Sequence, residues 1–316
     1  MSGEDAHLRL PILEADLLRV VDTALAEDLG MGDVTTDTLI DPAWLAEGSL
    51  LVKAAGVLAG MPVAAAVFRR VDPDIAFVTT LLDGTPVRPG DVAGRVQGPA
   101  ASILRAERTA LNLLQRLSGV ASETARYVEA VKGLPVRILD TRKTTPGLRS
   151  LEKYAVRVGG GHNHRHNLAD GVLIKDNHLE ALAQAGRTLT DAVRLARAGA
   201  PHTVRIEVEV TTLEQAQEAV AAGADCILLD NMSADQMRSA VRLIAEQAAR
   251  LGVSKPQTEA SGGITLERVR AVAESGVDLI SVGALTHSFK ALDISLELSY
   301  QVSQGFPASS VEAQEP

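Results

Sequence analysis

Apolar and polar positions from Arg137 onward repeat a two-part unit, in which a short apolar run of β character is followed by a helical pattern. Six such runs occur, at residues 137–143, 171–176, 205–210, 225–230, 258–263 and 278–284. Between them, apolar residues recur at helical spacing, as at Met237, Ala240, Val241, Ile244 and Ala248. Alternating strands and helices predict parallel pairing with right-handed crossovers. Because the runs are almost wholly apolar, both faces of the predicted sheet should be covered.

The repeating region is too short for a complete eightfold α/β barrel, which takes about 250 residues. We therefore expect an incomplete barrel and assign no further strand. Two of its helices have predicted starts with capping-box spacing, Thr212 with Gln215 and Ser233 with Gln236.

The first 125 residues follow a different pattern. An amphipathic helix is predicted from Leu13 to Leu25, strand-like alternation from Ser49 to Ala59, and a hairpin over residues 83–98. We expect domains at residues 1–125 and 126–288, with residues 289–316 as a C-terminal segment that ends in a loose tail.

Composition is that of an ordinary globular protein, with 46 % hydrophobic and 22 % charged residues. A net charge of −9 and an aromatic content of 3 % argue against nucleic acid as a partner. The longest apolar run, residues 56–68, is too short to span a bilayer, and the N-terminus lacks a signal-peptide core. The single cysteine, Cys226, favours a reducing, cytoplasmic compartment.

Residues able to do chemistry follow the apolar runs, at the predicted carboxyl ends of the strands. In parallel α/β folds these ends share one face, where the functional site lies. We expect one cleft to collect Asp140, Thr141, Arg142, Lys143, Lys175, Asp176, Glu207, Glu209, Asp230, Asn231, Glu259, Ser261, Gly262, Gly263, Ser281 and Gly283.

Charges in this set are segregated. Residues 137–175 contain eight basic and three acidic residues, inside a chain of negative net charge. Three of the basic residues have helical spacing and are interpreted as exposed helix residues: Arg149, Lys153 and Arg157. Four of the others lie at strand ends or in a glycine loop, where a buried cation is costly without a counter-charge. An anionic ligand is therefore predicted, held by Arg142, Lys143, Arg165 and Lys175.

Two glycine motifs, at residues 260–264 and 281–285, end consecutive strands and precede helices. In barrels the last two strand ends commonly hold a phosphate by backbone N–H groups. Glu209 and Asp230 end neighbouring strands, where they could bind Mg²⁺, accept hydrogen bonds from sugar hydroxyls or cap the following helix.

Three histidines alternate in residues 159–167, at His162, His164 and His166. Alternate residues of an extended segment share a face, so this spacing is typical of a metal site. Arg165 lies inside the run and favours an anion instead. A metal-dependent hydrolase of the barrel type stays an alternative, although no later predicted strand ends in histidine.

Several motifs together resemble the quinolinate phosphoribosyltransferase family over nearly the whole chain. They are EDLGMGDVTTD (27–37), AERTALNLLQRLSGVAS (106–122), ILDTRKTTPGLRSLEKYAV (138–156), GGGHNHRHNLADGVLIKDNH (159–178), IEVEV, LLDN, EASGGI and SVGALTHS. The resemblance implies an N-terminal α/β sandwich domain, an open seven-stranded α/β barrel, and a chain end that returns to the first domain. It also implies a homodimer, possibly within a higher oligomer, in which one subunit closes the other's site.

The reaction that the resemblance implies joins quinolinate to phosphoribosyl pyrophosphate with Mg²⁺, and gives nicotinate mononucleotide, CO₂ and pyrophosphate for NAD biosynthesis. Carboxylate binding would fall to Arg142, His164, Arg165 and Lys175, with Arg116 from the partner subunit. Lys143 and Lys175 would face the pyrophosphate, and Glu209 and Asp230 the ribose hydroxyls and Mg²⁺. The rest of the implied substrate set is Thr141 together with Ser261, Gly262, Gly263, Ser281, Val282 and Gly283 around the 5′-phosphate.

Two relatives of similar architecture remain alternatives: a non-catalytic homologue of the kind associated with molybdenum transport, and nicotinate phosphoribosyltransferase, which takes a monocarboxylate. The complete basic set favours the enzyme that acts on quinolinate.

Overall fold

The computed structural model describes residues 12–301, which form two compact units. The first comprises the described residues up to Gln115 together with those from Leu292, and the second runs from Arg116 to Ala291. A 31-residue helix, α4 (Ala100–Ala130), contains the first boundary, whereas the sequence pattern placed it at residue 125. The N-terminal residues 1–11 and the whole of the predicted loose tail, residues 302–316, lie outside the described residues.

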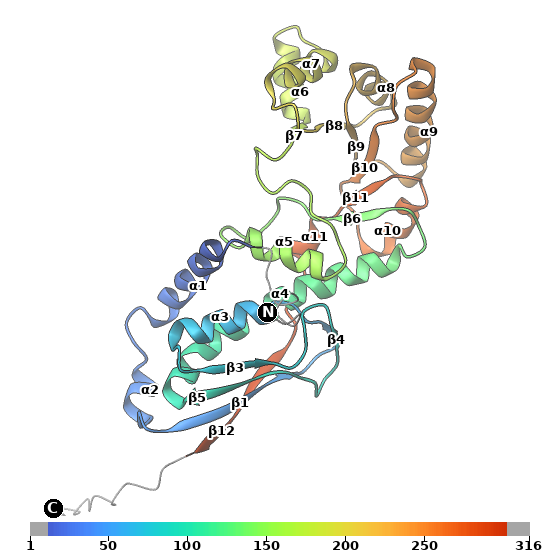
Figure 1. The fold of residues 1–316 in the computed structure, drawn as a ribbon. Coiled ribbons are helices and arrows are strands. Elements are labelled where there is room, and N and C mark those ends of the chain that lie inside the picture. Colours follow the sequence, from blue (N-terminus) through green and yellow to red (C-terminus); the bar gives the residue numbers. More distant parts are fainter. Residues whose placement is uncertain (1–11, 302–316) are drawn as a thin grey trace, which may run out of the picture. The chain divides into compact units, whose positions relative to one another are not determined.

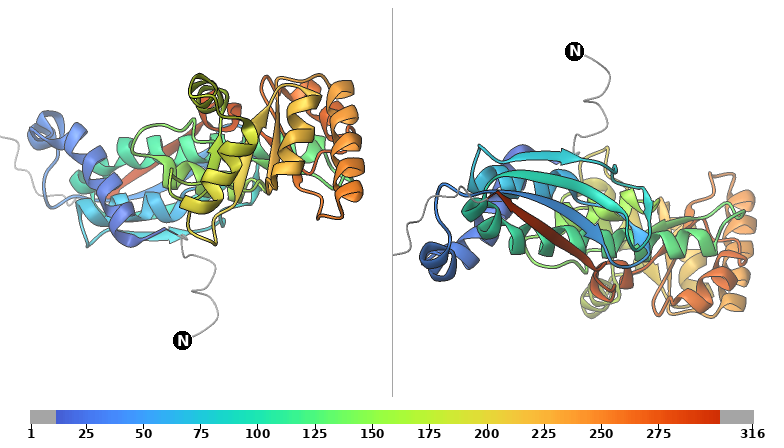
Figure 2. Two further views of the ribbon diagram at one scale, coloured as in Figure 1. Left: turned by 90° about the horizontal axis from the view of Figure 1, so that it is seen from above. Right: turned by 90° about the horizontal axis from the view of Figure 1, so that it is seen from below.

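The first unit is built on an antiparallel sheet. In spatial order its strands are β12 (Ile294–Gln301), β1 (Leu45–Val52), β5 (Val92–Pro99) and β3 (Ala76–Thr79), and a separate pair joins β2 (Gly56–Val57) to β4 (Pro86–Val87). Strand β12, near the end of the chain, pairs with β1 along its whole length, as Figure 2 shows. The hairpin predicted over residues 83–98 is wrong, because β4 and β5 pair with other strands.

Helices α1 (Glu14–Leu29), α2 (Val34–Leu39), α3 (Met61–Val71) and the start of α4 complete the first unit. Met61 and Phe68 of α3 are fully buried, and the ring of Phe68 lies 5.7 Å from that of Phe77 on β3. The Asp83 carboxylate accepts hydrogen bonds from the N–H groups of Gly60 and Met61, at 2.7 and 3.0 Å. It thereby satisfies N–H groups that a helix start leaves without partners.

The second unit contains a parallel sheet of six strands, each on one of the six predicted runs. Their order is β6 (Arg137–Leu139), β11 (Leu279–Ser281), β10 (Gln257–Ser261), β9 (Cys226–Asp230), β8 (Ile206–Val210) and β7 (Val172–Ile174). All adjacent strands pair in parallel, which confirms the α/β class. The seventh barrel strand implied by the resemblance has no counterpart in this sheet over residues 12–301.

Seven helices alternate with these strands (Figure 1): α5 (Arg149–Val158), α6 (Asp176–Gln184), α7 (Leu189–Gly199), α8 (Leu213–Ala222), α9 (Ala234–Leu251), α10 (Leu266–Ala273) and α11 (Ala284–His287). The apolar stripe predicted for α9 is largely buried, at Met237, Ala240, Ile244 and Ala248. Ser233 forms the predicted capping box with Gln236, while Thr212 caps α8 by accepting the Gln215 N–H. No helix in the described part of the chain is long and apolar enough to cross a membrane.

Candidate active site

A cavity of about 710 Å³ lies at the carboxyl ends of the parallel strands. Nearly all of the residues that the sequence pointed to line it: Thr141, Arg142, Lys143, His164, Arg165, Lys175, Asp176, Glu209, Asp230, Asn231, Glu259, Ser261, Gly262, Gly263, Ser281 and Gly283. The parallel topology therefore brings these separate stretches of the sequence to one place, as strand-end geometry predicts.

Two residues implied by the resemblance lie elsewhere in the unit. Val282 is 1 % exposed and does not line the cavity, and its N–H donates to the carbonyl of Leu139 at 2.9 Å. Arg116 lines a neighbouring pocket that also includes Lys143. Its guanidinium donates to Glu152 at 2.6 Å and lies 4.9 Å from the ring centroid of Phe289. The two pockets share Lys143 and His287.

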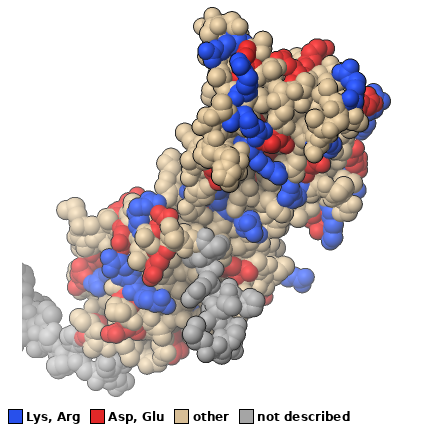
Figure 3. All heavy atoms as spheres, turned by 45° about the horizontal axis from the view of Figure 1, so that its top comes forward, with Lys and Arg blue, Asp and Glu red and all other residues tan. Residues whose placement is uncertain are grey.

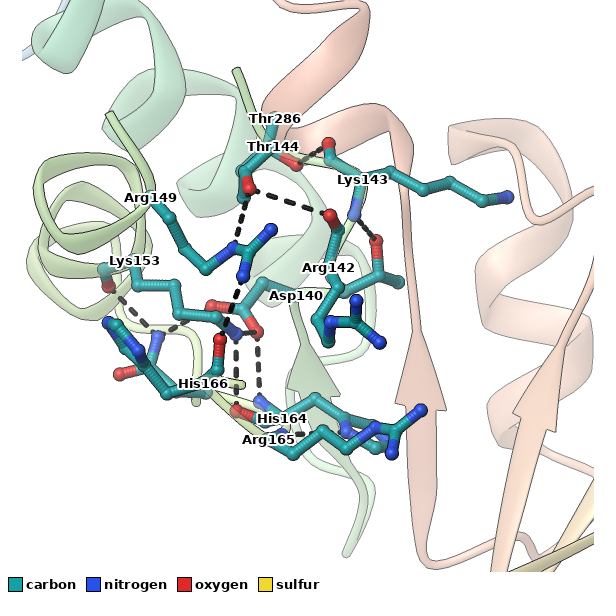
Figure 4. A network of polar contacts seen from close by, with 12 residues as sticks. Asp140, Arg142, Lys143, Thr144, Arg149, Lys153, His164, Arg165, His166 and Thr286 are labelled. Carbon is teal, nitrogen blue, oxygen red and sulfur yellow. Dashed lines mark hydrogen bonds and ion pairs between the residues drawn. The ribbon is translucent and has the colours of Figure 1, made fainter. Parts of the chain in front are cut away.

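Arg142 and Arg165 form the cationic part of the cavity. Burial and the charge of Arg142 lower the pKa of Arg165. The Nε of Arg142 is buried and has no hydrogen-bond partner among the described residues, while Nη1 of Arg165 donates to the carbonyl of Gly171 at 3.0 Å. In Figure 4 the side chains of both arginines and of Lys143 extend away from Asp140. Two neighbouring, partly buried guanidinium groups call for an anionic ligand.

The loop that contains His164 and Arg165 is held by a buried ion pair between Asp140 and Lys153. The interpretation of Lys153 as an exposed helix residue is wrong, since it is 2 % exposed. Asp140 also accepts the side-chain amide of Asn163 at 2.6 Å and the N–H of His164 at 2.8 Å. Burial raises the pKa of Asp140 and lowers that of Lys153 against their mutual attraction. Figure 4 shows Asp140 at the centre of this network.

Glu209 and Asp230 form the anionic part of the cavity. Burial and the negative charge of Asp230 raise the pKa of Glu209. Lys175 opposes this effect with its Nζ 3.9 Å from a Glu209 carboxylate oxygen, and it is half exposed. A second cation would stabilise the two carboxylates further. In Figure 3, Lys and Arg side chains of the second unit form a band across the face turned forward, with acidic side chains beside it.

A glycine turn after β10 forms another part of the cavity wall. Gly262 and Gly263 have φ of 89° and 58°, which favour glycine. A Cβ on Gly262 would lie 2.2 Å from Oδ1 of Asn231, itself a left-handed residue with φ of 54°. A Cβ on Gly283 would lie 3.0 Å from Cδ of Lys143. The turn therefore requires glycine and has a lysine stem against the neighbouring Gly283, a combination typical of phosphate sites.

Glu207 and Glu259 form a buried pair that the sequence analysis placed at strand ends without assigning it a role. Glu207 stands two positions before Glu209, and Glu259 two positions before Ser261. Because alternate residues of a strand share a face, each glutamate lies one layer deeper than the strand-end residue on the same face. His164 Nε2 lies 3.1 Å from Glu207 and 3.5 Å from Glu259. In the sequence, the sign of this pair was the spacing of two residues between each glutamate and the strand-end residue that follows it.

The alternating histidines do not share a site. His166 contacts Ser150, and the metal-type cluster found among the described residues is His164 with Glu207 and Glu259. The other ring nitrogen of His164, Nδ1, accepts the N–H of Arg165 at 2.7 Å. Both nitrogens of His164 are therefore engaged within the protein, whereas the resemblance implied a free donor for a substrate carboxylate.

Comparisons with known proteins agree with this architecture. Residues 33–118 match the model of the quinolinate phosphoribosyl transferase N-terminal domain, and residues 120–297 that of the C-terminal domain. A probable nicotinate-nucleotide pyrophosphorylase (carboxylating) of Bacillus subtilis (strain 168) is 43 % identical over 283 residues, or 90 % of this chain and 93 % of the relative.

Solved structures give the same result. NadC from Streptococcus pyogenes superposes with a TM-score of 0.85 at 41 % identity, over 93 % of this chain and all of that one. The nicotinate-nucleotide pyrophosphorylase from Francisella tularensis gives a TM-score of 0.84 at 36 % identity, over 92 % and 98 % of the two chains. With both of its domains matched, the chain belongs to the quinolinate phosphoribosyl transferase family.

Proposed function

We propose that this chain transfers the phosphoribosyl group of phosphoribosyl pyrophosphate to quinolinate and decarboxylates the product, giving nicotinate mononucleotide, CO₂ and pyrophosphate in de novo NAD biosynthesis. The observation that carries the proposal is the pair of neighbouring guanidinium groups, Arg142 and Arg165, in a cavity that also holds a glycine turn and a carboxylate pair. Relatives that bear the corresponding enzyme names support it.

Each substrate group has a complementary part of the cavity. The two carboxylates of quinolinate would bind Arg142, Arg165 and Lys175, and the 5′-phosphate the backbone around Gly262 and Gly283. Lys143 would face the pyrophosphate, because its stem lies against Gly283. The positive charge that develops on the sugar as its bond to pyrophosphate breaks would be stabilised by Glu209 and Asp230. No covalent nucleophile is required, and the catalysis rests on positioning and electrostatics.

Mg²⁺ fits the carboxylate pair. Burial and the negative charge of Asp230 raise the pKa of Glu209, and a divalent cation would offset the charge of this pair. Glu209 and Asp230 would hold the ion directly or through water, and the ion would neutralise charge on the pyrophosphate leaving group. A cytoplasmic setting accords with the single cysteine, Cys226, which is buried and unpaired.

We infer a homodimer in which Arg116 completes the partner subunit's site. Because Glu152 is 0 % exposed and pairs with Arg116, Arg116→Lys is a cleaner test than alanine, since it keeps a cation beside this carboxylate. Arg116→Lys and Arg165→Lys are each expected to be poorly active. A refolded equal mixture should recover about a quarter of the wild-type activity, since half of the dimers would have one intact site. If heterodimers form but no activity is recovered, the proposal that the two subunits share their active sites is contradicted.

Gly262→Ala is expected to destabilise the protein by about 1–3 kcal/mol, because alanine is strained at positive φ and meets Asn231. It should also raise KM for phosphoribosyl pyrophosphate more than KM for quinolinate. Gly252→Ala is the matched control, with φ of 68° and open space around the added methyl group. Equal effects of the two variants on KM would argue against a phosphate site at Gly262.

The activity is tested by incubating the purified protein with Mg²⁺, phosphoribosyl pyrophosphate and either quinolinate or nicotinate. Nicotinate mononucleotide is expected from quinolinate alone, because the cavity supplies two guanidinium groups for two carboxylates. Turnover of nicotinate alone would favour a nicotinate phosphoribosyltransferase, and turnover of neither acid a non-catalytic homologue.

A further inference from the structure

Glu207, Glu259 and His164 form a buried cluster below the cationic part of the cavity. Glu259 is 2 % and Glu207 8 % exposed. Glu259 also lines the cavity, and its Oε1 has no hydrogen-bond partner among the described residues. The donor atoms of all three side chains lie within 4.8 Å of one another. Two buried carboxylates this close cannot both ionise cheaply, so one of them retains a proton.

The surroundings of the cluster identify the carboxyl that keeps the proton. Around Glu259 are Glu207 on β8, Cys226 on β9, Ser281 on β11 and His164 on the loop. His164 provides the nitrogen donor among them, and its Nε2 is closer to Glu207, at 3.1 Å, than to Glu259, at 3.5 Å. Since Nδ1 accepts the Arg165 N–H, the ring proton is on Nε2, which donates to Glu207. The shared proton is therefore assigned to Glu259, which lies farther from this donor.

The charge of the cluster acts on the proposed quinolinate site. Glu207 already attracts the Arg165 guanidinium, whereas Arg142 repels it. A second negative charge on Glu259, which lines the same cavity as Arg165, would compete with a substrate carboxylate for this cation. A neutral Glu259 leaves the positive charge of the two arginines available to the ligand.

We propose that Glu259 is a positioning residue that stays a carboxylic acid during turnover, so that the Glu207–Glu259 pair carries one negative charge, orients His164 and leaves Arg165 free to bind a substrate carboxylate. This role rests on the proposed function. It assigns Glu259 no contact with the reacting atoms, and it predicts an effect on the binding of quinolinate rather than on the chemical step.

The sign of the pH dependence follows from burial and the charge of Glu207, which raise the pKa of Glu259 to about 8. Below this pH Glu259 is neutral, and above it the second negative charge appears. KM for quinolinate is therefore expected to rise at least fivefold between pH 7 and pH 9, while kcat and KM for phosphoribosyl pyrophosphate change less.

Glu259→Gln tests the proposal, because glutamine has the size of the neutral acid and cannot ionise. At pH 7 its KM for quinolinate should lie within about threefold of wild type, and the rise toward pH 9 should disappear. Glu218→Gln is the control: this exposed carboxylate accepts from Thr190 outside the cavity and should keep the wild-type profile. A rise that persists in Glu259→Gln, or a tenfold higher KM at pH 7, would overturn the proposal.

Infrared titration of the wild-type protein tests the buried acid without relying on a variant or on turnover. A carboxylic acid band should be present at pH 7 and disappear near pH 8, and its absence at pH 7 would overturn the proposal. Tightly bound transition metal at one ion per chain, lost in Glu259→Gln, would instead identify the cluster as a metal site. If the wild-type protein lacks turnover of quinolinate, the proposed function fails, while the titration still reports on Glu259.

Discussion

Lys153→Met is expected to lower the free energy of unfolding by about 3–5 kcal/mol. Methionine keeps most of the volume of the lysine stem but removes the cation that Asp140 pairs with. Asp140 is 0 % exposed, so its carboxylate would remain buried without a counter-charge. Chemical denaturation monitored by circular dichroism measures the change.

Arg157→Met is the matched control, because Arg157 lies on the same helix and is exposed. It should change the stability by less than about 0.5 kcal/mol. Lys153→Met should also lower activity, since Asp140 holds the N–H of His164 and Lys153 itself donates to the His164 carbonyl at 3.1 Å. Equal stabilities of the two variants would mean that the buried pair does not hold the loop.

Arg165→Met should reduce kcat/KM for quinolinate by about 10- to 150-fold, the equivalent of one charge-assisted hydrogen bond of about 1.5–3 kcal/mol. The reason is that Arg165 and Arg142 face the same cavity and repel each other as like charges, which an anionic substrate would neutralise. Steady-state kinetics with quinolinate as the varied substrate measures the loss.

The control for Arg165 is Arg187→Met, an exposed arginine outside the cavity, which should leave kcat/KM unchanged. KM for phosphoribosyl pyrophosphate should stay within about twofold in both variants. A loss in Arg165→Met that falls on phosphoribosyl pyrophosphate instead would place the arginine at the pyrophosphate and contradict its role at the carboxylates.

The barrel strands were predictable because their signal is local. Each run combines residues of β character with polar residues at its end, and all six form parallel strands in one sheet. The hairpin over residues 83–98 was not, since the turn residues are present but β5 pairs with β1 and β3 from other parts of the chain. Partner choice between strands depends on packing over long sequence distances, which periodicity does not encode.

The same distinction applies to the site. Strand-end position identified most of the residues that line the cavity. Lys153 was misread, because its helical spacing with Arg149 and Arg157 carries no sign of its ion pair with Asp140. The Glu207–Glu259 contact was missed because it depends on which strands are neighbours, even though each glutamate stands two positions before a strand-end residue. Contacts between side chains on different strands and helices, and the charge states that these contacts impose, could be identified only from the three-dimensional structure.

The proposed reaction is tested most directly by the ratio of CO₂ to pyrophosphate to nicotinate mononucleotide formed. The substrate is quinolinate that is isotopically labelled in the carboxyl group adjacent to the ring nitrogen. With Mg²⁺ and phosphoribosyl pyrophosphate, the wild-type protein should release one labelled CO₂ for each pyrophosphate and each nicotinate mononucleotide formed. Pyrophosphate release without labelled CO₂, or the absence of both in a folded, pure protein, would contradict it.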